Sequence, residues 1–366
     1  MTLTIRSEAR PPDGPVDDPS LSAARRRLRA MSIWTVAFAA WWLFLGLPLT
    51  DPILTFGWLW AATIAWRIDR PRRVHLRFAR DWIAVVVLLQ VYNLSRGLAD
   101  QGVVPHALEM IVADRGMFGW LTDGRVPTLW LQEHLFDPDG IHWWDVFASW
   151  VYFSHFVVTP AVAVVLWLRD RARWLAFVLR WIMLSAAGLV TYFLYPAAPP
   201  WWAARYGLLD PVERGSTRAW DAIGLHGAGN LINAGQYSSN PVAAMPSLHT
   251  AFALLVVVFF LPRVRHRWWP LLLAYPLAMT FTLVYSGEHY MIDVFMGWLY
   301  VGLVCVAARL FERRWGPLSR ARAERAAADR ALAAGSDADA AGSGVRSDTV
   351  DGRLLTAGAQ PREETL

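Results

Sequence analysis

Two short motifs in the chain each place a histidine near the start of a long apolar segment. In the first, Met-Pro-Ser-Leu-His, Ser247 precedes His249 by two positions. In the second, Gly-Glu-His-Tyr-Met-Ile-Asp, His289 precedes Asp293 by four positions. Residues four apart share one face of a helix, so the sequence predicts that the carboxylate of Asp293 lies one turn from the imidazole of His289.

This pairing indicates phosphoryl transfer. A carboxylate beside an imidazole fixes its tautomer and stabilises its charged form, which suits a histidine that attacks phosphorus. We expect His289 to be the nucleophile and Asp293 its partner. We expect His249 to protonate the leaving oxygen and later to deprotonate the acceptor. Backbone N–H groups at the helix starts, at Ser247 and near His289, are expected to bind the phosphate.

Further candidates for substrate binding lie near the ends of other apolar segments. Arg96 could offer a guanidinium fork to the phosphate, although an arginine that anchors a helix end at the membrane interface is equally common. The segment 195–202 could line the site, or it could be a proline turn with interfacial tryptophans. The candidate substrate-binding residues are Ser247, Arg96, Tyr195, Pro200, Trp201, Arg205 and Glu288.

Two imidazoles and a carboxylate could instead bind a metal ion. No third histidine or cysteine stands at a spacing that supports such a site, so we expect no metal and no other cofactor. The single cysteine, Cys305, lies in an apolar segment and rules out a disulfide framework within the chain.

The apolar residues come in blocks close to the length of a membrane-spanning helix. Of the 366 residues, 55% are hydrophobic and 22 are tryptophan. The expected fold class is all-α: a polytopic membrane helix bundle with about eight transmembrane helices, six of them forming a catalytic core. The second block is short for a full crossing. The blocks cover approximately residues 33–49, 53–66, 82–98, 143–168, 174–195, 246–262, 269–285 and 289–310.

The positions of the basic residues predict the orientation. All 35 basic residues are arginine, and the net charge is +5. They cluster between the apolar blocks, as membrane flanks do, and this pattern argues against a nucleic-acid partner. Arginine-rich connections at 67–80, 169–173 and 263–267 would all lie inside if the chain begins inside. We therefore expect both termini in the cytoplasm and the site on the extracytoplasmic side of a bacterial-type plasma membrane.

Composition divides the chain into four parts. Residues 1–30 are expected to be a disordered cytoplasmic segment and 31–80 an N-terminal helix pair with a basic loop. Residues 81–311 are expected to form the catalytic membrane domain, with long external loops at 99–142 and 196–245. Residues 312–366 have the composition of a largely disordered cytoplasmic tail.

The histidine motifs resemble those of the type-2 phosphatidic acid phosphatase superfamily of membrane phosphotransferases, over about residues 80–310. The Pro-Ser-x-His motif of that family matches at Ser247 and His249, and its His-x3-Asp motif matches at His289 and Asp293. The resemblance implies that His289 is the nucleophile oriented by Asp293. It also implies that His249 is the acid and base, and that Ser247 helps to bind phosphate.

The chain departs from the phosphatase members of that family. They carry a Lys-x6-Arg-Pro motif, and this chain has no lysine. They also carry an arginine six residues before the nucleophile, where this chain has Leu283, so the source of its phosphate-binding cation stays open. Residues 198–201 and 287–293 are instead similar to the inositol phosphorylceramide synthase-like (inositolphosphotransferase) branch.

That resemblance implies a lipid phosphotransferase. It would move a phospho-head group, inositol-phosphate-like, from a phospholipid donor to an alcohol acceptor. With water as the acceptor, the same three residues would make the protein a phosphatase of lipid phosphates or polyprenyl diphosphates.

Two other classes are disfavoured. A transporter would use the polar residues for binding only, but its typical internal repeats are not visible in this sequence. A membrane glycosyltransferase would use loop acids such as Asp51 or Asp137, and it leaves the ordered histidine motifs unexplained.

Overall fold

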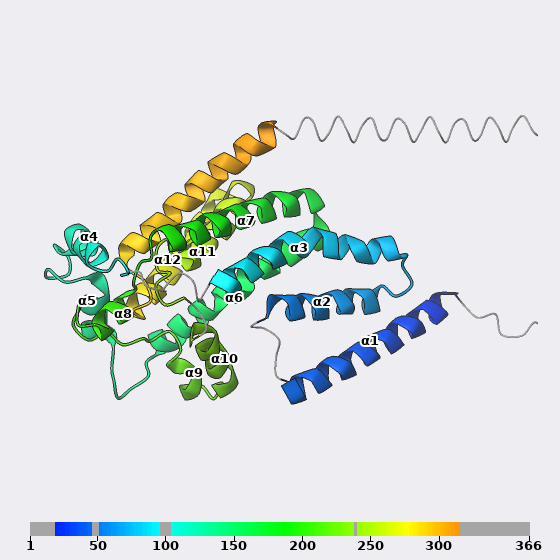
Figure 1. Cartoon of the computed structure of the whole chain (residues 1–366), viewed down its shortest axis with the longest axis horizontal. Helices are drawn as coiled ribbons and strands as arrows, with labels where there is room; N and C mark the ends of the chain where they lie inside the picture. The colour runs from blue at the N-terminus through cyan, green and yellow to red at the C-terminus, as the bar shows by residue number, and fades with distance from the viewer. Residues whose placement is uncertain (1–18, 46–50, 96–103, 238–239, 315–366) are drawn as a thin grey trace, which may run out of the picture. The chain divides into compact units, whose positions relative to one another are not determined.

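The computed structural model describes residues 19–45, 51–95, 104–237 and 240–314 (Figure 1). Every regular element in these residues is a helix, which confirms the all-α class; only isolated bridges join extended segments. The candidate Arg96 lies outside the described residues. The chain forms two compact units, Met1–Val306 and Ala307–Leu366, and the histidine motifs lie in the first.

The helices are joined by short connections and by two longer segments that are themselves partly helical. They are α1 (Pro19–Leu45), α2 (Pro52–Trp66), α3 (Arg72–Ser95), α4 (Leu108–Phe118), α5 (Pro127–Leu135), α6 (Trp143–Arg169), α7 (Arg171–Leu194), α8 (Pro200–Arg205), α9 (Ala219–Ala222), α10 (His226–Tyr237), α11 (Leu248–Phe260), the short turns η2 (Leu261–Arg263) and η3 (His266–Trp268), α12 (Trp269–Tyr285), and a last helix, Met291–Arg314.

Several helix starts follow directly from local sequence. Asp51 accepts hydrogen bonds from the amides of Ile53 and Leu54, and Pro52 occupies the first helical position of α2. Asp170 likewise accepts from the amide of Arg173 and begins α7. These side chains satisfy amides that have no partner within the helix, and proline at the first position loses no helical hydrogen bond.

Five helices are long and apolar enough to cross a membrane, by length and composition, within the described residues. They include α1, α6, α7, α12 with the turn before it, and the Met291–Arg314 helix. α2 and α11 are apolar but shorter, and α3 begins with an arginine-rich stretch. The polytopic helical membrane architecture is confirmed, whereas the total of eight crossings stays a prediction.

Two segments differ from the sequence expectation. α1 begins at Pro19 and so extends into the segment expected to be disordered, because its Ala-, Arg- and Leu-rich residues favour a helix. The long connections expected as external loops contain α4 and α5 in the first, and α8, α9 and α10 in the second.

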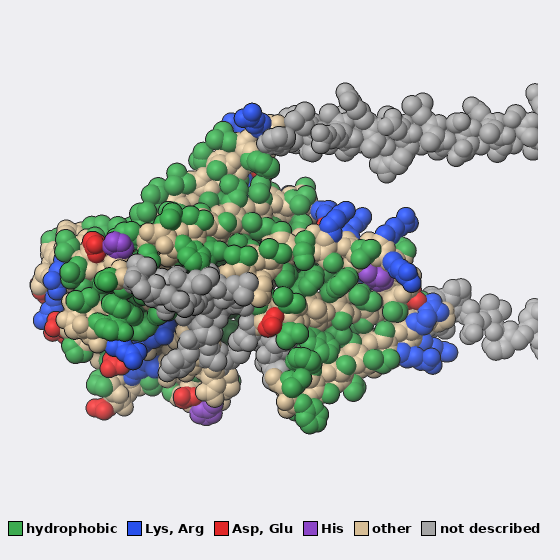
Figure 2. All heavy atoms as spheres, in the orientation of Figure 1, with side chains coloured by type: hydrophobic (Ala, Val, Ile, Leu, Met, Phe, Trp, Pro, Cys, Tyr) green, Lys and Arg blue, Asp and Glu red, His purple; other side chains and the backbone are tan. Residues whose placement is uncertain are grey.

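Hydrophobic side chains cover much of the surface of the long helices, as expected for helices that face lipid (Figure 2). Arginines gather where α1 begins and where α2 meets α3, the end of these helices away from α4 and α8 (Figures 1 and 2). There Arg26 forms an ion pair with Asp69 at 2.5 Å.

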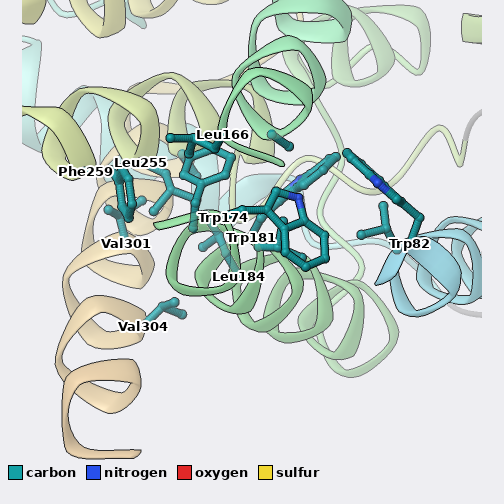
Figure 3. Packing of buried hydrophobic residues seen from close by; sticks show 14 of the residues in the cluster. Trp82, Leu166, Trp174, Trp181, Leu184, Leu255, Phe259, Val301 and Val304 are labelled. Carbon is teal, nitrogen blue, oxygen red and sulfur yellow. The ribbon is translucent and has the colours of Figure 1, made fainter. Parts of the chain in front are cut away.

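The main cluster of buried hydrophobic side chains includes residues of α11 and of the Met291–Arg314 helix, the two helices that follow the histidine motifs. α11 packs against α6, α7 and α12, and α3 packs against α7. Close packing of this kind, rather than exclusion of water, stabilises helices within lipid. The cluster includes Trp82 of α3, Leu166 of α6, Trp174, Trp181 and Leu184 of α7, Leu255 and Phe259 of α11, and Val301 and Val304 of the Met291–Arg314 helix (Figure 3).

Candidate active site

The two histidine motifs meet in one buried site. Nε2 of His289 lies 3.4 Å from Nδ1 of His249. The other ring nitrogen of His289 lies 3.5 Å from Oδ2 of Asp293, which is within ion-pair range but longer than a good hydrogen bond. His289 is 5% exposed and Asp293 is fully buried. The carboxylate therefore faces Nδ1 and leaves Nε2 directed at the second histidine.

Backbone contacts join the two motifs to each other. The amide of Ser247 donates to the carbonyl of Asp293 at 3.0 Å. Gly297, one turn further along, approaches this turn so closely that a Cβ atom there would lie 2.5 Å from the carbonyl oxygen of Ser247. Tyr192 of α7 donates to the carbonyl of Pro246 at 2.9 Å. The start of α11 is thus fitted against the helix that follows His289.

Ser247 itself is buried and acts as the N-cap of α11. Its hydroxyl accepts from the amide of Thr250 at 3.5 Å, a long hydrogen bond. Capping explains why serine suits this position. The expected role of Ser247 in binding phosphate stays a prediction.

A buried carboxylate that the sequence analysis missed organises the start of the Met291–Arg314 helix. Asp114 of α4 accepts from the amides of Met291 (2.9 Å) and Ile292 (3.0 Å) and is fully buried. Burial, with a smaller contribution from the charge of Asp293, outweighs the lowering effect of the two hydrogen bonds and raises the pKa of Asp114 to about 7.

This arrangement corrects one expectation. The amide of Tyr290 donates to Oδ2 of Asp293 at 2.9 Å, and the next two amides donate to Asp114. The prediction that the helix start near His289 offers its amides to phosphate is therefore wrong for the amides of Tyr290, Met291 and Ile292. Protein carboxylates already occupy them.

A third histidine, also missed, lies beside His249. The ring of His155 on α6 is 4.1 Å from the ring of His249, centroid to centroid, and stacks on Phe252 on another side. The ring of Tyr152, one turn earlier on α6, stacks on His249 at 5.2 Å. These contacts fix the plane of the His249 imidazole. Polar residues inside a membrane helix are the sequence signal that could have indicated them.

The Tyr-Pro-Ala-Ala-Pro-Pro-Trp segment follows α7 and leads into α8, whose first residues are Pro200 and Trp201. His106 exchanges backbone hydrogen bonds with Pro196 and Ala198, and the ring of His106 stacks on Tyr195 at 3.8 Å. The amide of Trp201 donates to the carbonyl of Gly287, two residues before His289, at 3.1 Å.

Three of the candidates therefore lie close to the second motif. The Trp201 amide is bonded directly to it, Pro200 beside Trp201 is buried, and Tyr195 packs against the hydrophobic cluster that contains Tyr290 of the motif.

Glu288 is the centre of a polar network. Its carboxylate accepts from Nε (2.8 Å) and Nη2 (3.0 Å) of Arg214 and from the hydroxyl of Ser216 (2.6 Å). Gln236 donates to the same carboxylate at 3.1 Å and to the hydroxyl of Tyr152 at 3.1 Å. The network therefore extends from the residue before His289 to the residue that stacks on His249.

Arg205 and Arg214 lie in different surroundings, a difference that the sequence alone does not show. The candidate Arg205 stands exposed at the end of α8. Arg214 was not a candidate, but its guanidinium lies 4.6 Å from the centre of the Trp201 ring and is paired with Glu288. No local pattern marks Arg214, because its partner is far along the chain.

Comparison with known proteins agrees with these motifs. Residues 127–307, which include both histidine motifs, match the family model described as the PAP2 superfamily. The chain belongs to the PAP2 superfamily. The resemblance to the type-2 phosphatidic acid phosphatase superfamily seen in the sequence is therefore confirmed.

Two curated relatives support the inositol phosphorylceramide synthase-like branch of the PAP2 superfamily. The chain is 28% identical over 179 residues to the phosphoinositol dihydroceramide synthase of Bacteroides thetaiotaomicron, covering 43% of this chain and 54% of that protein. It is 29% identical over 119 residues to the inositol phosphorylceramide synthase catalytic subunit AUR1 of Saccharomyces cerevisiae, covering 30% and 28%. The chain thus spans about half or less of each relative, and no solved structure matches it.

Proposed function

We propose that this PAP2-superfamily protein is an integral-membrane lipid phosphotransferase that works through a phosphohistidine. The observation that carries the proposal is the placement of the two imidazoles. Nε2 of His289 faces His249 at 3.4 Å, while Asp293 faces the opposite nitrogen. This is the arrangement that a nucleophile and an opposing acid require.

In the first half-reaction, Nε2 of His289 attacks the phosphorus of a phospholipid, and an N–P bond forms as the bond to the lipid oxygen breaks. His249 donates its proton to that departing oxygen, which leaves as an alcohol. Asp293 holds Nδ1–H and stabilises the positive charge that develops on the ring.

In the second half-reaction, the neutral His249 removes a proton from the hydroxyl of the acceptor. The acceptor oxygen attacks phosphorus and the N–P bond breaks, which returns His289 to its starting state. The phospho-head group has then moved from one lipid to another alcohol.

The distance between the rings requires a movement. An in-line reaction places phosphorus and the transferred oxygen between the two nitrogens, which needs more than the 3.4 Å that separates them. We expect His249 and His289 to move apart when the lipid binds.

The buried surroundings favour transfer over hydrolysis. His289 is 5% exposed and Tyr152 and His155 pack around His249, so water has limited access. The relatives named as phosphoinositol dihydroceramide and inositol phosphorylceramide synthases support an inositol-phosphate-like head group as the transferred unit. The alternative is a phosphatase of lipid phosphates that uses the same residues with water.

The proposal includes an orientation. We propose that both termini lie in the cytoplasm and that the site faces the extracytoplasmic side of a bacterial-type plasma membrane. The gathering of arginines at the end of the helices away from α4 and α8 supports it. Labelling of single cysteines introduced at exposed Asp139 and exposed Asp69 in intact cells tests it: only the former should react with an impermeant reagent.

The experiment that tests the function uses purified full-length protein in lipid nanodiscs with a head-group-labelled phospholipid. We expect label to appear on an added alcohol or ceramide-like acceptor, and His289→Ala to abolish both turnover and an acid-labile labelled protein. Release of the label to water at an equal rate without an acceptor would overturn the transferase in favour of the phosphatase.

A further inference from the structure

Arg214 is ion-paired with Glu288, the residue that precedes His289. A phosphoryl group needs positive charge around its non-bridging oxygens, and the phosphatase members place an arginine six residues before the nucleophile. Here that position is Leu283, which is fully buried among apolar side chains. Arg214, by contrast, forms an ion pair with Glu288, and Gln236 links Glu288 to Tyr152, whose ring stacks on His249.

The guanidinium of Arg214 is held along its edge and over its face. Glu288 pairs with Nε and Nη2, and the Trp201 ring lies 4.6 Å from the guanidinium carbon. The Arg214 side chain is 30% exposed, whereas that of Glu288 is 8% exposed. A guanidinium fixed in this way loses little freedom when it binds a phosphate, and its side chain is partly exposed to solvent.

Glu288, the ion-pair partner of Arg214, limits the negative charge that a phosphate group bound at this site can carry. Glu288 offsets the guanidinium charge, and Asp293 adds a second carboxylate close by. A phosphomonoester carries about −1.5 to −2 at pH 7, whereas a phosphodiester carries a single negative charge. Because Glu288 offsets part of the positive charge of Arg214, this guanidinium is better matched to the singly charged phosphodiester than to the phosphomonoester.

On the basis of the proposed function, we propose that Arg214, held by Glu288 and Trp201, is the phosphate-binding cation of this site and that it selects phosphodiester lipids over phosphomonoester lipids. Arg214 takes the role of the arginine missing at position 283. The donor is then a lipid with its head group in place, and the reaction transfers that head group with its phosphate.

The test compares two lipids with the same acyl chains, phosphatidylinositol and phosphatidate, as substrates of the full chain in nanodiscs. Arg214→Gln should lower kcat/KM for phosphatidylinositol by a factor on the order of 10² to 10³, with a raised KM. Arg214→Lys should recover part of the loss, because it keeps the charge but not the fork. Arg125→Gln removes another ion-paired arginine, on the exposed surface, and should leave turnover unchanged.

Glu288→Gln tests the charge argument. It keeps the shape of the side chain and removes its charge, so the ratio of kcat/KM for phosphatidate to that for phosphatidylinositol should rise by at least about tenfold. General damage to the fold would lower both values and leave this ratio unchanged. Millimolar guanidinium should also restore part of the activity of Arg214→Ala, which a purely structural role of Arg214 would not allow.

The outcomes separate the two proposals. If the wild-type protein converts neither lipid, the proposed function fails and this inference with it. If it converts phosphatidylinositol but Arg214→Gln matches Arg125→Gln, the function stands and the role of Arg214 is refuted. A wild-type preference for phosphatidate, or an unchanged ratio in Glu288→Gln, would refute the selection of phosphodiesters.

Discussion

Removal of the Asp114 carboxylate should loosen the start of the helix that carries Asp293. In Asp114→Ala, the amides of Met291 and Ile292, two partly buried residues, lose the buried carboxylate to which they donate. Loss of an N-cap costs about 0.5–2 kcal/mol, and a buried amide without a partner costs about 1–3 kcal/mol. Burial of the carboxylate is itself unfavourable and offsets part of this loss, as its raised pKa indicates.

The net expectation is a destabilisation of about 2 kcal/mol at the helix start. Local opening of this turn should therefore become about 30 times more frequent. Hydrogen–deuterium exchange of a peptide covering residues 287–300 measures that change directly. Turnover should fall as well, because the same turn orients His289 against Asp293.

Glu109→Gln is the matched control, because Glu109 lies on the same helix α4 but is an exposed carboxylate paired with His106. It should leave exchange at 287–300 unchanged. Exchange in Asp114→Ala as slow as in Glu109→Gln would refute the view that Asp114 positions this helix.

The same residue predicts a pH dependence. Because the pKa of folded Asp114 is raised from 3.8 to about 7, the folded state binds its proton more tightly than the unfolded state. This contribution to stability is full below pH 3.8 and is lost as pH rises to about 7. Asp114→Asn does not titrate, so the difference in thermal midpoint between it and the wild type should change as pH rises from 3.8 to about 7. A constant difference would contradict the raised pKa.

Three further variants test the geometry of the site. Asp293→Asn should keep the thermal midpoint but lower kcat by a factor on the order of 10³, because an amide leaves His289 in the wrong tautomer; an unchanged kcat would remove Asp293 from the mechanism. Gly297→Ala should cost about 1–3 kcal/mol in unfolding free energy, because its Cβ meets the Ser247 carbonyl, whereas Gly302→Ala on the same helix, with open space around it, should cost nothing. His155→Ala should lower kcat at an unchanged KM, and His155→Phe should restore it by keeping a ring against His249; equal rates for the two variants would show that the stacking has no role.

Much of the fold was predictable from local sequence. Apolar blocks of spanning length required helices, because lipid leaves no other way to satisfy the backbone. The starts of α2 and α7 could be read from Asp51 and Asp170, which cap the adjacent residues. The pairing of His289 with Asp293 was predicted from the helical repeat; the two side chains lie 3.5 Å apart, although His289 precedes the helix that begins at Met291.

The proximity of His249 to His289 was an inference from membrane topology, and the structure agrees with it. The partners of the second motif could not be inferred in the same way. Asp114 binds amides 177 and 178 residues further along the chain, and Arg214 pairs with a residue 74 positions away. Neither residue has a distinctive local pattern.

The sequence by itself therefore predicted the helices, the family and the candidate histidines, because apolar blocks and short motifs can be read along the chain. The tertiary structure alone decided which carboxylate accepts hydrogen bonds from the helix amides and which arginine pairs with Glu288. Buried amides and charges must find partners wherever the packed chain brings one within hydrogen-bond distance. For the second motif those partners are Asp114 and Arg214, which α4 and the segment before α9 bring to it.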